Sequence, residues 1–211
     1  MSTRIVIVGA GGFGRGVHSW ITTSPRFLAE NQVEDVVFID DNANPALLPG
    51  QLISTIADYT SELNDRVLCA IAAPKVRQHL VEQLQNKGAQ FATFIDDRVI
   101  TAGGSTVGEG SIVCPGVVLD ADVTLEDHVH VNFNSSVGHD TVIGEFSTLS
   151  PATNIMGEVS VGQGSFFGGS AVILPRTTIG EHSVIGAGAV VLHGTDANVT
   201  VVGNPARQIS R

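Results

Sequence analysis

Residues 107–148 run VGEGSI VCPGVV LDADVT LEDHVH VNFNSS VGHDTV IGEFST when they are divided into blocks of six. A bulky aliphatic residue opens each block, and the residue at the fifth position is always small or β-branched. The frame extends without a slip from the block opening at Ile95 to the block opening at Val191, and among its 17 first positions only Thr101 is not apolar. A repeat of six residues predicts a solenoid, in which each block supplies one short strand and one corner.

The predicted solenoid has a triangular coil, because three blocks complete one turn. The 17 blocks then give between five and six coils. Their inward aliphatic side chains would form one continuous apolar column, and parallel strands would join successive coils. The alternative is an ordinary sandwich of alternating strands, whose turns would be irregularly spaced. The unbroken frame favours the solenoid.

The residues before the repeat have a different pattern, in which apolar strands alternate with helices. The sequence predicts strands at 4–8, 36–39 and 67–72, a helix from the glycines after the first strand to about Thr23, and a helix at 75–87. Such alternation is typical of a small parallel α/β unit. We therefore expect two domains, which comprise residues 1–90 and 91–211.

The helix at 75–87 has a regular apolar spacing. Val76, Leu80 and Leu84 follow one another at intervals of four residues, so we expect them to form its buried stripe. Gly88 is placed to end this helix.

A glycine-rich loop follows the first predicted strand. Residues 9–14 read GAGGFG and match the pattern G-x-G-x-x-G between a strand and a helix. Glycines let backbone N–H groups approach a phosphate, and a helix N-terminus favours an anion. Asp40 and Asp41 end the second strand, where an acidic residue binds a ribose hydroxyl in dinucleotide folds. The unit is too short for both halves of such a fold, which favours a mononucleotide-type ligand over NAD; a glycine turn that only packs tightly is the alternative.

Residues 135–140, SSVGHD, place a histidine beside a carboxylate within the repeat. His139 and Asp140 occupy the third and fourth positions of their block, so both should project outward from a corner. A histidine in this setting can act as a general base, because its pKa lies near neutral pH and the carboxylate can orient it. A solvated corner histidine is the alternative, and we expect that role for His128 and His182 at other fourth positions.

The chain resembles a known family through five segments in fixed order: GAGGFG at 9–14, FIDD at 38–41, AIAAPKVR at 70–77, SSVGHD at 135–140 and VVGNPAR at 201–207. This family comprises the bacterial nucleotide-sugar acetyltransferases of the sialic-acid O-acetyltransferase and bacillosamine or perosamine N-acetyltransferase type. The resemblance covers almost the whole chain. It implies a Rossmann-like N-terminal domain that binds the nucleotide sugar and a left-handed parallel β-helix that binds acetyl-CoA. It also implies homotrimers with active sites between neighbouring β-helices.

The resemblance also implies roles for single residues. His139 would be the general base that deprotonates the sugar amine or hydroxyl, Asp140 would orient it, and Asn132 would place the acceptor group. The backbone N–H of Gly157 would stabilise the oxyanion. Acetyl-CoA would lie along Gly157, Gly169, Ala187, Asn204 and Pro205. The nucleotide sugar would be held by Gly9, Gly11, Gly12, Phe13, Asp40, Asp41, Ala72 and Arg77.

Three residues depart from the family pattern. Many members have a histidine where this chain has Phe13, and some carry a second active-site histidine where this chain has Thr148. Pro74 stands near the expected ligand and has no N–H to donate. We expect these departures to affect which sugar is recognised rather than the chemistry.

Charge and composition limit the partners. The net charge of −10 argues against a nucleic acid or an anionic membrane surface. Residues 95–211 alone carry a net charge of −8, so acetyl-CoA would be held by backbone N–H groups and a few arginines, with Arg176 and Arg207 as candidates.

The two cysteines fit no metal or redox spacing. No apolar run reaches the length of a transmembrane helix, and the first residues do not resemble a signal peptide. We expect a cytoplasmic protein.

Four candidate functions can be compared with these sequence features. The favoured one is transfer of an acetyl group from acetyl-CoA to the amine of a nucleotide-linked sugar, and a sugar hydroxyl as acceptor is the first alternative. A zinc enzyme of the carbonic anhydrase kind would need a closing His-x4-His pair, and no two histidines here are five residues apart. We therefore expect no metal. A solenoid that only binds ligands would explain the repeats but not the glycine loop together with His139 and Asp140.

Overall fold

The computed structural model describes residues 2–209 and divides the chain into two compact units. The first unit ends at Asp97 and the second begins at Arg98. The sequence placed this boundary at 90/91, and the outermost residues of the two predicted domains, residue 1 and residues 210–211, lie outside the described residues.

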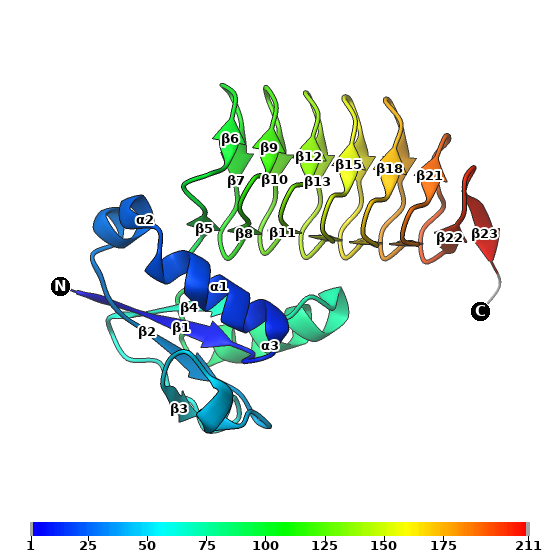
Figure 1. The fold of residues 1–211 in the computed structure, drawn as a ribbon. Coiled ribbons are helices and arrows are strands. Elements are labelled where there is room, and N and C mark those ends of the chain that lie inside the picture. The colour runs from blue at the N-terminus through cyan, green and yellow to red at the C-terminus, as the bar shows by residue number, and fades with distance from the viewer. Residues whose placement is uncertain (1, 210–211) are drawn as a thin grey trace. The chain divides into compact units, whose positions relative to one another are not determined.

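The first unit contains a four-stranded parallel sheet with the strand order β3-β2-β1-β4 (Figure 1). The strands of this sheet are β1 (Thr3–Val8), β2 (Val33–Ile39), β3 (Leu52–Ser54) and β4 (Asp65–Cys69). β5 (Phe94–Ile95) comes shortly before residue 97 and is not part of this sheet. Its helices are α1 (Gly12–Thr22), α2 (Pro25–Glu30), the short 3-10 helix η1 (Pro45–Leu47) and α3 (Pro74–Asn86). The three predicted strands and two predicted helices are confirmed, whereas α2, η1 and β3 were not predicted.

Two details of the α/β unit correct the sequence prediction. β4 ends at Cys69 rather than at residue 72. The predicted stripe of α3 is only partly correct: Leu84 is buried, but Val76 is 50% exposed, Leu80 is half-buried, and the buried face consists of Arg77, Val81 and Leu84. The guanidinium of Arg77 donates hydrogen bonds to the backbone carbonyls of Ile71 and Ala72, in the loop before α3, and this turns the Arg77 face of the helix inward.

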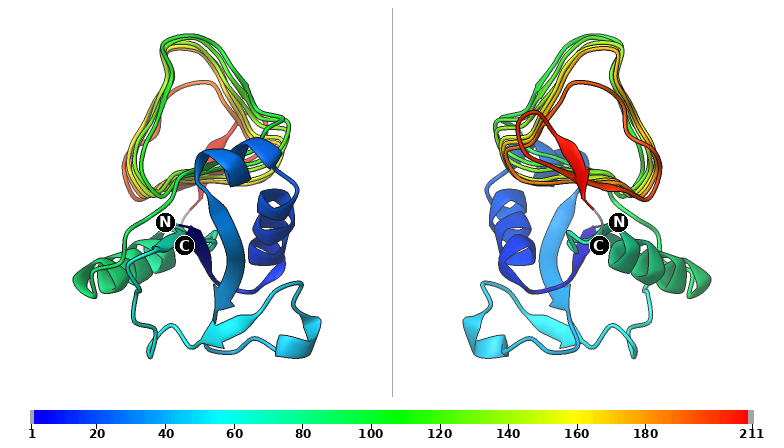
Figure 2. Two further views of the ribbon diagram at one scale, coloured as in Figure 1. Left: turned by 90° about the vertical axis from the view of Figure 1, so that its left-hand side faces the viewer. Right: turned by 90° about the vertical axis from the view of Figure 1, so that its right-hand side faces the viewer.

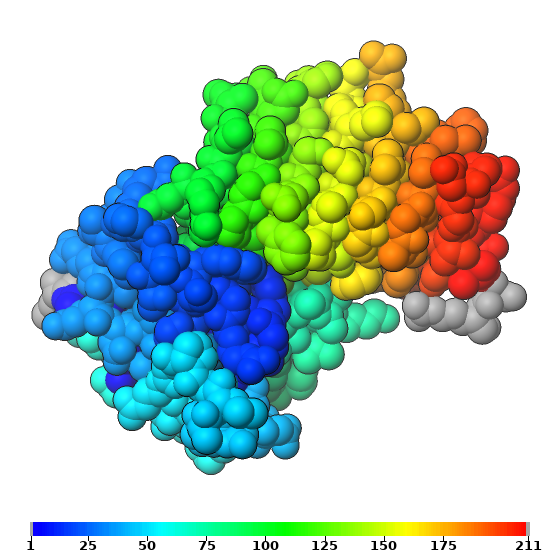
Figure 3. All heavy atoms as spheres, viewed as in Figure 1, coloured from blue at the N-terminus to red at the C-terminus, as the bar shows by residue number. Residues whose placement is uncertain are grey.

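The second unit is a parallel β-solenoid of two-residue strands, which confirms the predicted fold class. Strands 18 residues apart pair in register, so three blocks of six form one coil. Viewed along its axis, the solenoid is triangular, and its coils superpose except for the C-terminal one in orange to red (Figure 2). The space-filling view shows these coils packed side by side in chain order, from green to red (Figure 3).

The strands of the solenoid form three faces. Face 1 consists of β6 (Ile100–Thr101), β9 (Val118–Leu119), β12 (Ser136–Val137), β15 (Asn154–Ile155), β18 (Val172–Ile173) and β21 (Val190–Val191). Face 2 consists of β7 (Thr106–Val107), β10 (Thr124–Leu125), β13 (Val142–Ile143), β16 (Ser160–Val161) and β19 (Thr178–Ile179). Face 3 includes β8 (Ile112–Val113), β11 (His130–Val131), β14 (Thr148–Leu149), β17 (Phe166–Phe167), β20 (Val184–Ile185) and β22 (Thr200–Val202), followed by the antiparallel β23 (Arg207–Ile209).

The core of the solenoid is built as the repeat predicts. From Val113 to Val191, every first-position side chain is at most 3% exposed. Several fifth-position hydroxyls have a polar role that the sequence analysis missed. The hydroxyl of Thr141 donates to the carbonyl of Met156 at 3.0 Å and accepts the N–H of Val159 at 3.2 Å. Such hydroxyls therefore join the backbones of successive coils.

The corners turn through a left-handed residue at the fourth position. The φ angles there lie between 53° and 60° at the non-glycine residues Asp122, His128, Asn134, Asp140, Phe146, Ala152, Glu158, Ser170, Arg176 and His182. The prediction that His128 is solvated was wrong: the residue is 3% exposed, and its ring stacks on that of Phe146 with centroids 5.0 Å apart. His182 is only partly exposed.

Candidate active site

The glycine loop of the α/β unit connects β1 to α1. Gly9 has a φ of +92°, and its N–H donates to the carbonyl of Ile39 at 3.0 Å. A side chain on Gly14 would overlap the carbonyl of Gly9, so the helix can pack on the loop only with glycine there. These two glycines are therefore required by the fold itself.

Gly11 and Gly12 differ from the other two glycines, because a Cβ at either position would meet nothing within 4 Å. Gly11 is the N-cap of α1, and no side chain caps the helix at this residue. The first backbone N–H groups of a helix lack intrahelical partners and attract anions. The loop thus presents an accessible helix N-terminus, as the sequence predicts for a phosphate site.

The two acidic residues after β2 organise this region. The carboxylate of Asp40 accepts the N–H of Ala10 at 2.8 Å and the N–H of Asn42 at 2.8 Å. The carboxylate of Asp41 accepts the N–H of Ile56 at 2.8 Å. Asp40 therefore fixes the glycine loop directly, while both carboxylates retain further lone pairs for a ligand.

The remaining predicted sugar-site residues lie after β4 and at the start of α1. Ala72 is exposed. Arg77 is completely buried, and its Nη1 donates to the carbonyl of Ile71 at 2.7 Å and to that of Ala72 at 3.3 Å. Burial lowers the pKa of Arg77 to about 10. Arg77 therefore holds the backbone of the 71–72 loop from its buried side. Phe13 is half-buried and packs edge to face against Trp20.

Pro74, which cannot donate a hydrogen bond, has a structural explanation. It is the first residue of α3, where its fixed φ suits the helix and no N–H is needed.

His139 and Asp140 form a hydrogen-bonded pair on an exposed corner between faces 1 and 2. Nδ1 of His139 lies 2.8 Å from a carboxylate oxygen of Asp140, and the side chain of His139 is 51% exposed. The carboxylate can only accept, so Nδ1 carries the hydrogen and Nε2 is left as the basic nitrogen. The hydrogen bond with Asp140 is the main reason that the pKa of His139 is raised above its ordinary value.

Gly157 lies beneath the ring of His139, one coil further along. A Cβ on Gly157 would be 2.5 Å from Nε2 and 2.7 Å from Cε1 of His139, so only glycine leaves room for this ring position. The carbonyl of His139 accepts the N–H of Glu158 at 2.8 Å, which joins the two coils at this point.

The predicted acetyl-CoA residues Gly157, Gly169 and Ala187 occupy the third position of their blocks, where the backbone N–H points away from the ladder of strands. At several corners a side chain accepts this N–H, as in Glu109, Ala121, Phe133 and Glu145. At Gly157, Gly169 and Ala187 no acceptor is found among residues 2–209, and the same holds at other third positions such as Gly103, His139 and Gln163. A backbone donor without a partner is available to a ligand.

The predicted site residues of the solenoid do not all lie together. His139, Asp140 and Gly157 share the corner between faces 1 and 2, whereas Asn132, Gly169 and Ala187 share the next corner, between faces 3 and 1. The turn containing Asn204 and Pro205 continues this second corner, because the carbonyl of Gly203 accepts the N–H of Val190 at 3.0 Å. Thr148 lies on neither corner but is buried in β14 on face 3.

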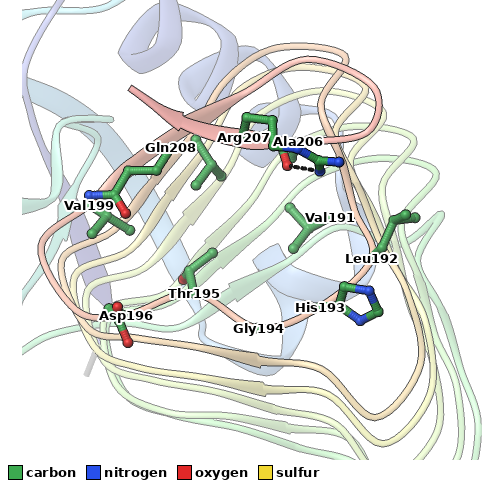
Figure 4. A pocket seen from close by; sticks show the side chains of 11 residues that line it. Val191, Leu192, His193, Gly194, Thr195, Asp196, Val199, Ala206, Arg207 and Gln208 are labelled. Carbon is green, nitrogen blue, oxygen red and sulfur yellow. Dashed lines mark hydrogen bonds between the residues drawn. The ribbon is translucent and has the colours of Figure 1, made fainter. Parts of the chain in front are cut away.

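A cavity of about 240 Å³ lies at the C-terminal end of the solenoid (Figure 4). Val191, Thr195 and Val201 line it together with residues of β23, including Arg207 and Gln208. Its lining residues include neither His139 nor Gly157, so it is separate from the predicted catalytic corner.

Sequence reasoning missed one ion pair at the catalytic corner. Glu158 follows Asp140 by 18 residues and is paired with Arg176, which follows by a further 18. This spacing, one coil per step, is the signal that would have found the pair.

Among residues 2–209, no group of three or more His, Cys, Asp or Glu side chains is arranged to hold a metal ion. In the same range, none of the helices has the length and hydropathy needed to cross a bilayer.

Two family models match the chain. Residues 4–84 match the PglD N-terminal domain, and residues 158–193 match the bacterial transferase hexapeptide, a unit of six repeats. A relative, the GDP-perosamine N-acetyltransferase of Escherichia coli O157:H7, is 30% identical over 147 residues. The match covers 67% of this chain and 66% of the relative, so the chain spans just under two thirds of the relative's length.

Two solved structures have the same fold over almost the whole chain. WeeI from Acinetobacter baumannii AYE is 31% identical with a TM-score of 0.88, and the match covers 99% of this chain and 100% of that one. PerB from Caulobacter crescentus, solved in complex with CoA and GDP-perosamine, is 27% identical with a TM-score of 0.83, and the match covers 98% and 97%.

The fold and the repeats define the class of this protein as a bacterial hexapeptide-repeat transferase. Within that class, the N-terminal domain and the relatives identify the family. The chain belongs to the hexapeptide-repeat nucleotide-sugar acetyltransferases, as the ordered motifs predicted.

Proposed function

We propose that this protein transfers the acetyl group of acetyl-CoA to the amino group of a nucleotide-linked amino sugar. The observation that carries the proposal is the pair of His139 and Asp140, which leaves a basic nitrogen on an exposed corner of the solenoid. The name of the relative supports an amine as acceptor, and the two ligands of PerB support a CoA thioester as donor.

The two units would bind different substrates. Gly9, Gly11, Gly12 and Phe13 place the start of α1 where it can receive the phosphates of the nucleotide sugar. Asp40, Asp41 and Ala72 border this site, and Arg77 supports it from inside the unit. Acetyl-CoA would bind on the solenoid.

The backbone would contribute much of the acetyl-CoA site. The unaccepted N–H groups of Gly157, Gly169 and Ala187 suit the carbonyl and amide oxygens of the thioester and pantetheine. The turn at Asn204 and Pro205 extends the corner of Gly169 and Ala187 towards the C-terminus.

The chemistry is a direct transfer within a ternary complex. Nε2 of His139 takes a proton from the sugar amine as the amine nitrogen attacks the thioester carbonyl. The N–H of Gly157 stabilises the resulting oxyanion, and Asn132 helps to place the acceptor. Collapse of this intermediate breaks the C–S bond, and the imidazolium returns the proton to the leaving thiolate. The products are the N-acetylated sugar and CoA.

An acetyl-cysteine intermediate is disfavoured by the environment of both thiols. Cys69 and Cys114 are buried. Burial raises the pKa of Cys69 to about 12, so this thiol stays protonated at neutral pH.

The active form would be a homotrimer. Asn132 and His139 lie on successive corners of one solenoid, so a second copy has to bring its corner to the first for the site to be complete. Cyclic association of identical solenoid faces achieves this for three equivalent sites. Light scattering tests the prediction, and an active monomer would contradict it. Because acetyl-CoA and nucleotide sugars are cytoplasmic metabolites, we place the reaction in the cytoplasm.

The second candidate is transfer to a sugar hydroxyl, as in the sialic-acid branch of the family. The same base would serve, because His139 can accept a proton from an alcohol as well as from an amine. Incubation of acetyl-CoA with UDP-, GDP- and TDP-linked sugars, in matched amino and hydroxyl forms, distinguishes the two candidates through thiol release and the mass of the product. Turnover confined to the hydroxyl forms would contradict the favoured function.

His139→Ala tests the catalytic assignment. Turnover should be lost while the melting temperature and acetyl-CoA binding by calorimetry are retained. His193→Ala is the matched control, because His193 occupies the same third position three coils further along. Unchanged turnover of His139→Ala would contradict the role of His139 as the base, whereas a wild-type protein that binds acetyl-CoA without any turnover would favour a solenoid that only binds ligands.

A further inference from the structure

Four charged residues follow one another along the catalytic corner, one in each coil. Asp122, Asp140, Glu158 and Arg176 occupy the fourth position of their blocks and are spaced 18 residues apart. Neighbouring strands of a sheet are separated by about 4.8 Å, so the three carboxylates stand in a row of close like charges. Arg176 is the cation that ends this row.

Glu158 and Arg176 are joined by a bidentate ion pair. Nε of Arg176 lies 3.1 Å and 3.2 Å from the two carboxylate oxygens of Glu158, and Nη2 lies 3.0 Å from one of them. This fork geometry directs the carboxylate of Glu158 towards the C-terminal end of the solenoid, where Arg176 lies.

The backbone holds this pair next to the catalytic residues. The N–H of Glu158 donates to the carbonyl of His139 at 2.8 Å, and the N–H of Arg176 donates to the carbonyl of Gly157 at 3.1 Å. The Glu158 side chain is therefore fixed one coil away from His139, close enough for its charge to affect the imidazole.

We propose that Arg176 is a positioning residue: by pairing with Glu158, it keeps this carboxylate from competing with Asp140 for the imidazole of His139. The inference rests on the proposed role of His139 as the general base. Its consequence is that Asp140 alone binds the imidazole and fixes its tautomer, while Asp120 and Glu158 act on it only through their charge.

The charges around His139 predict the direction of each effect. The hydrogen bond with Asp140 is the largest influence that raises the pKa of His139, and the charges of Asp140, Asp120 and Glu158 add to it. Arg176 in turn lowers the pKa of Glu158 through its hydrogen bond. Without Arg176, the charge of Glu158 is uncompensated and its carboxylate can rotate towards His139. The pKa of His139 should therefore rise. Removing the Glu158 charge leaves the cation alone, so the pKa of His139 should fall.

The test is a cycle of four full-length proteins: the wild type, Arg176→Gln, Glu158→Gln and the double variant. The pKa of His139 is measured directly by NMR titration of its ring protons, with the signal assigned from His139→Ala. We expect Arg176→Gln to raise this pKa by a few tenths of a pH unit, because the groups are exposed and partly screened. Glu158→Gln should lower it, and the double variant should return close to the wild type. Arg176→Lys should retain most of the wild-type value.

A control and a kinetic readout complete the test. Glu181→Gln removes one acidic charge at a different corner and should leave the titration of His139 unchanged. In pH profiles of kcat/KM, the acidic limb should follow the NMR value in each variant. If Arg176 instead binds a phosphate of CoA, the KM for acetyl-CoA rises equally in Arg176→Gln and in the double variant while the pKa does not move, and the inference is overturned. A pKa that moves as expected without any change in the pH profile would support the pairing and contradict the role of His139 as the base.

Discussion

The imidazole of His139 lies directly over Gly157 of the next coil, and a methyl group on that glycine would be 2.5 Å from Nε2. This relationship predicts that Gly157→Ala displaces the ring from its position. Because a misplacement of about 1 Å can cost ~100-fold in rate, kcat should fall by about that factor. The melting temperature should change little, since His139 is on the surface and can swing outward.

Gly103→Ala is the control for Gly157→Ala. Gly103 occupies the same third position of its block, two coils before His139, and a Cβ there would meet nothing within 4 Å. This variant should have wild-type activity. If Gly157→Ala were fully active as well, the contact with Gly157 would have no part in positioning the base.

The hydrogen bond between His139 and Asp140 predicts a pH effect. Because Asp140 raises the pKa of His139, Asp140→Asn should lower that pKa, and the acidic limb of kcat/KM should move to lower pH. The plateau rate should also fall, on the order of 10- to 100-fold, because the base is weaker and an amide no longer fixes the tautomer. A pH–rate profile with saturating acetyl-CoA measures both effects; an acidic limb that moves to higher pH would contradict the assignment.

The hexad frame carries enough information to predict the solenoid, because the same first position is buried in every block from Val113 to Val191. The same frame places His139 and Asp140 on a corner. It does not reveal contacts between coils, since these join residues 15 to 18 positions apart, such as Thr141 with Met156 and Glu158 with Arg176. His128 was misjudged for this reason, because its partner Phe146 is one coil away.

The α/β unit was harder to predict at the level of side chains. The spacing of Val76, Leu80 and Leu84 indicated a buried stripe, but a cation with hydrogen-bond partners inside the unit turned the helix towards Arg77. The resemblance implied that Arg77 holds the nucleotide sugar, whereas its guanidinium is buried and donates to the backbone of the 71–72 loop. Hydrophobic periodicity cannot detect such a case, because it counts arginine as exposed.

The coil-to-coil role of Thr141 predicts an effect on stability. Thr141→Val keeps the shape of the side chain but leaves the buried N–H of Val159 and the partly buried carbonyl of Met156 without their hydroxyl partner. The free energy of unfolding should fall by about 1–3 kcal/mol. Thr178→Val, on the exposed side of β19, should change it by less than about 0.5 kcal/mol. Thermal melts at one protein concentration compare the two, and equal losses would rule out the hydroxyl bridge.

The four glycines of the loop at 9–14 predict opposite outcomes for two similar substitutions. At Gly12 a methyl group would stand in open space over the start of α1, so Gly12→Ala should fold as well as the wild type or slightly better, because alanine favours a helix. The same methyl group would occupy the space in which a phosphate approaches the backbone. We expect the KM for the nucleotide sugar to rise about 10-fold or more, which corresponds to the loss of at least one good contact, with the KM for acetyl-CoA unchanged. At Gly14 the methyl group would overlap the carbonyl of Gly9, and Gly14→Ala should lower the free energy of unfolding by about 1–3 kcal/mol, the usual cost of overpacking. Initial rates with each substrate varied in turn, together with thermal melts, separate the two effects. A Gly12→Ala protein with normal KM for the nucleotide sugar would mean that the phosphates bind elsewhere, and the α/β unit would then lose its proposed role.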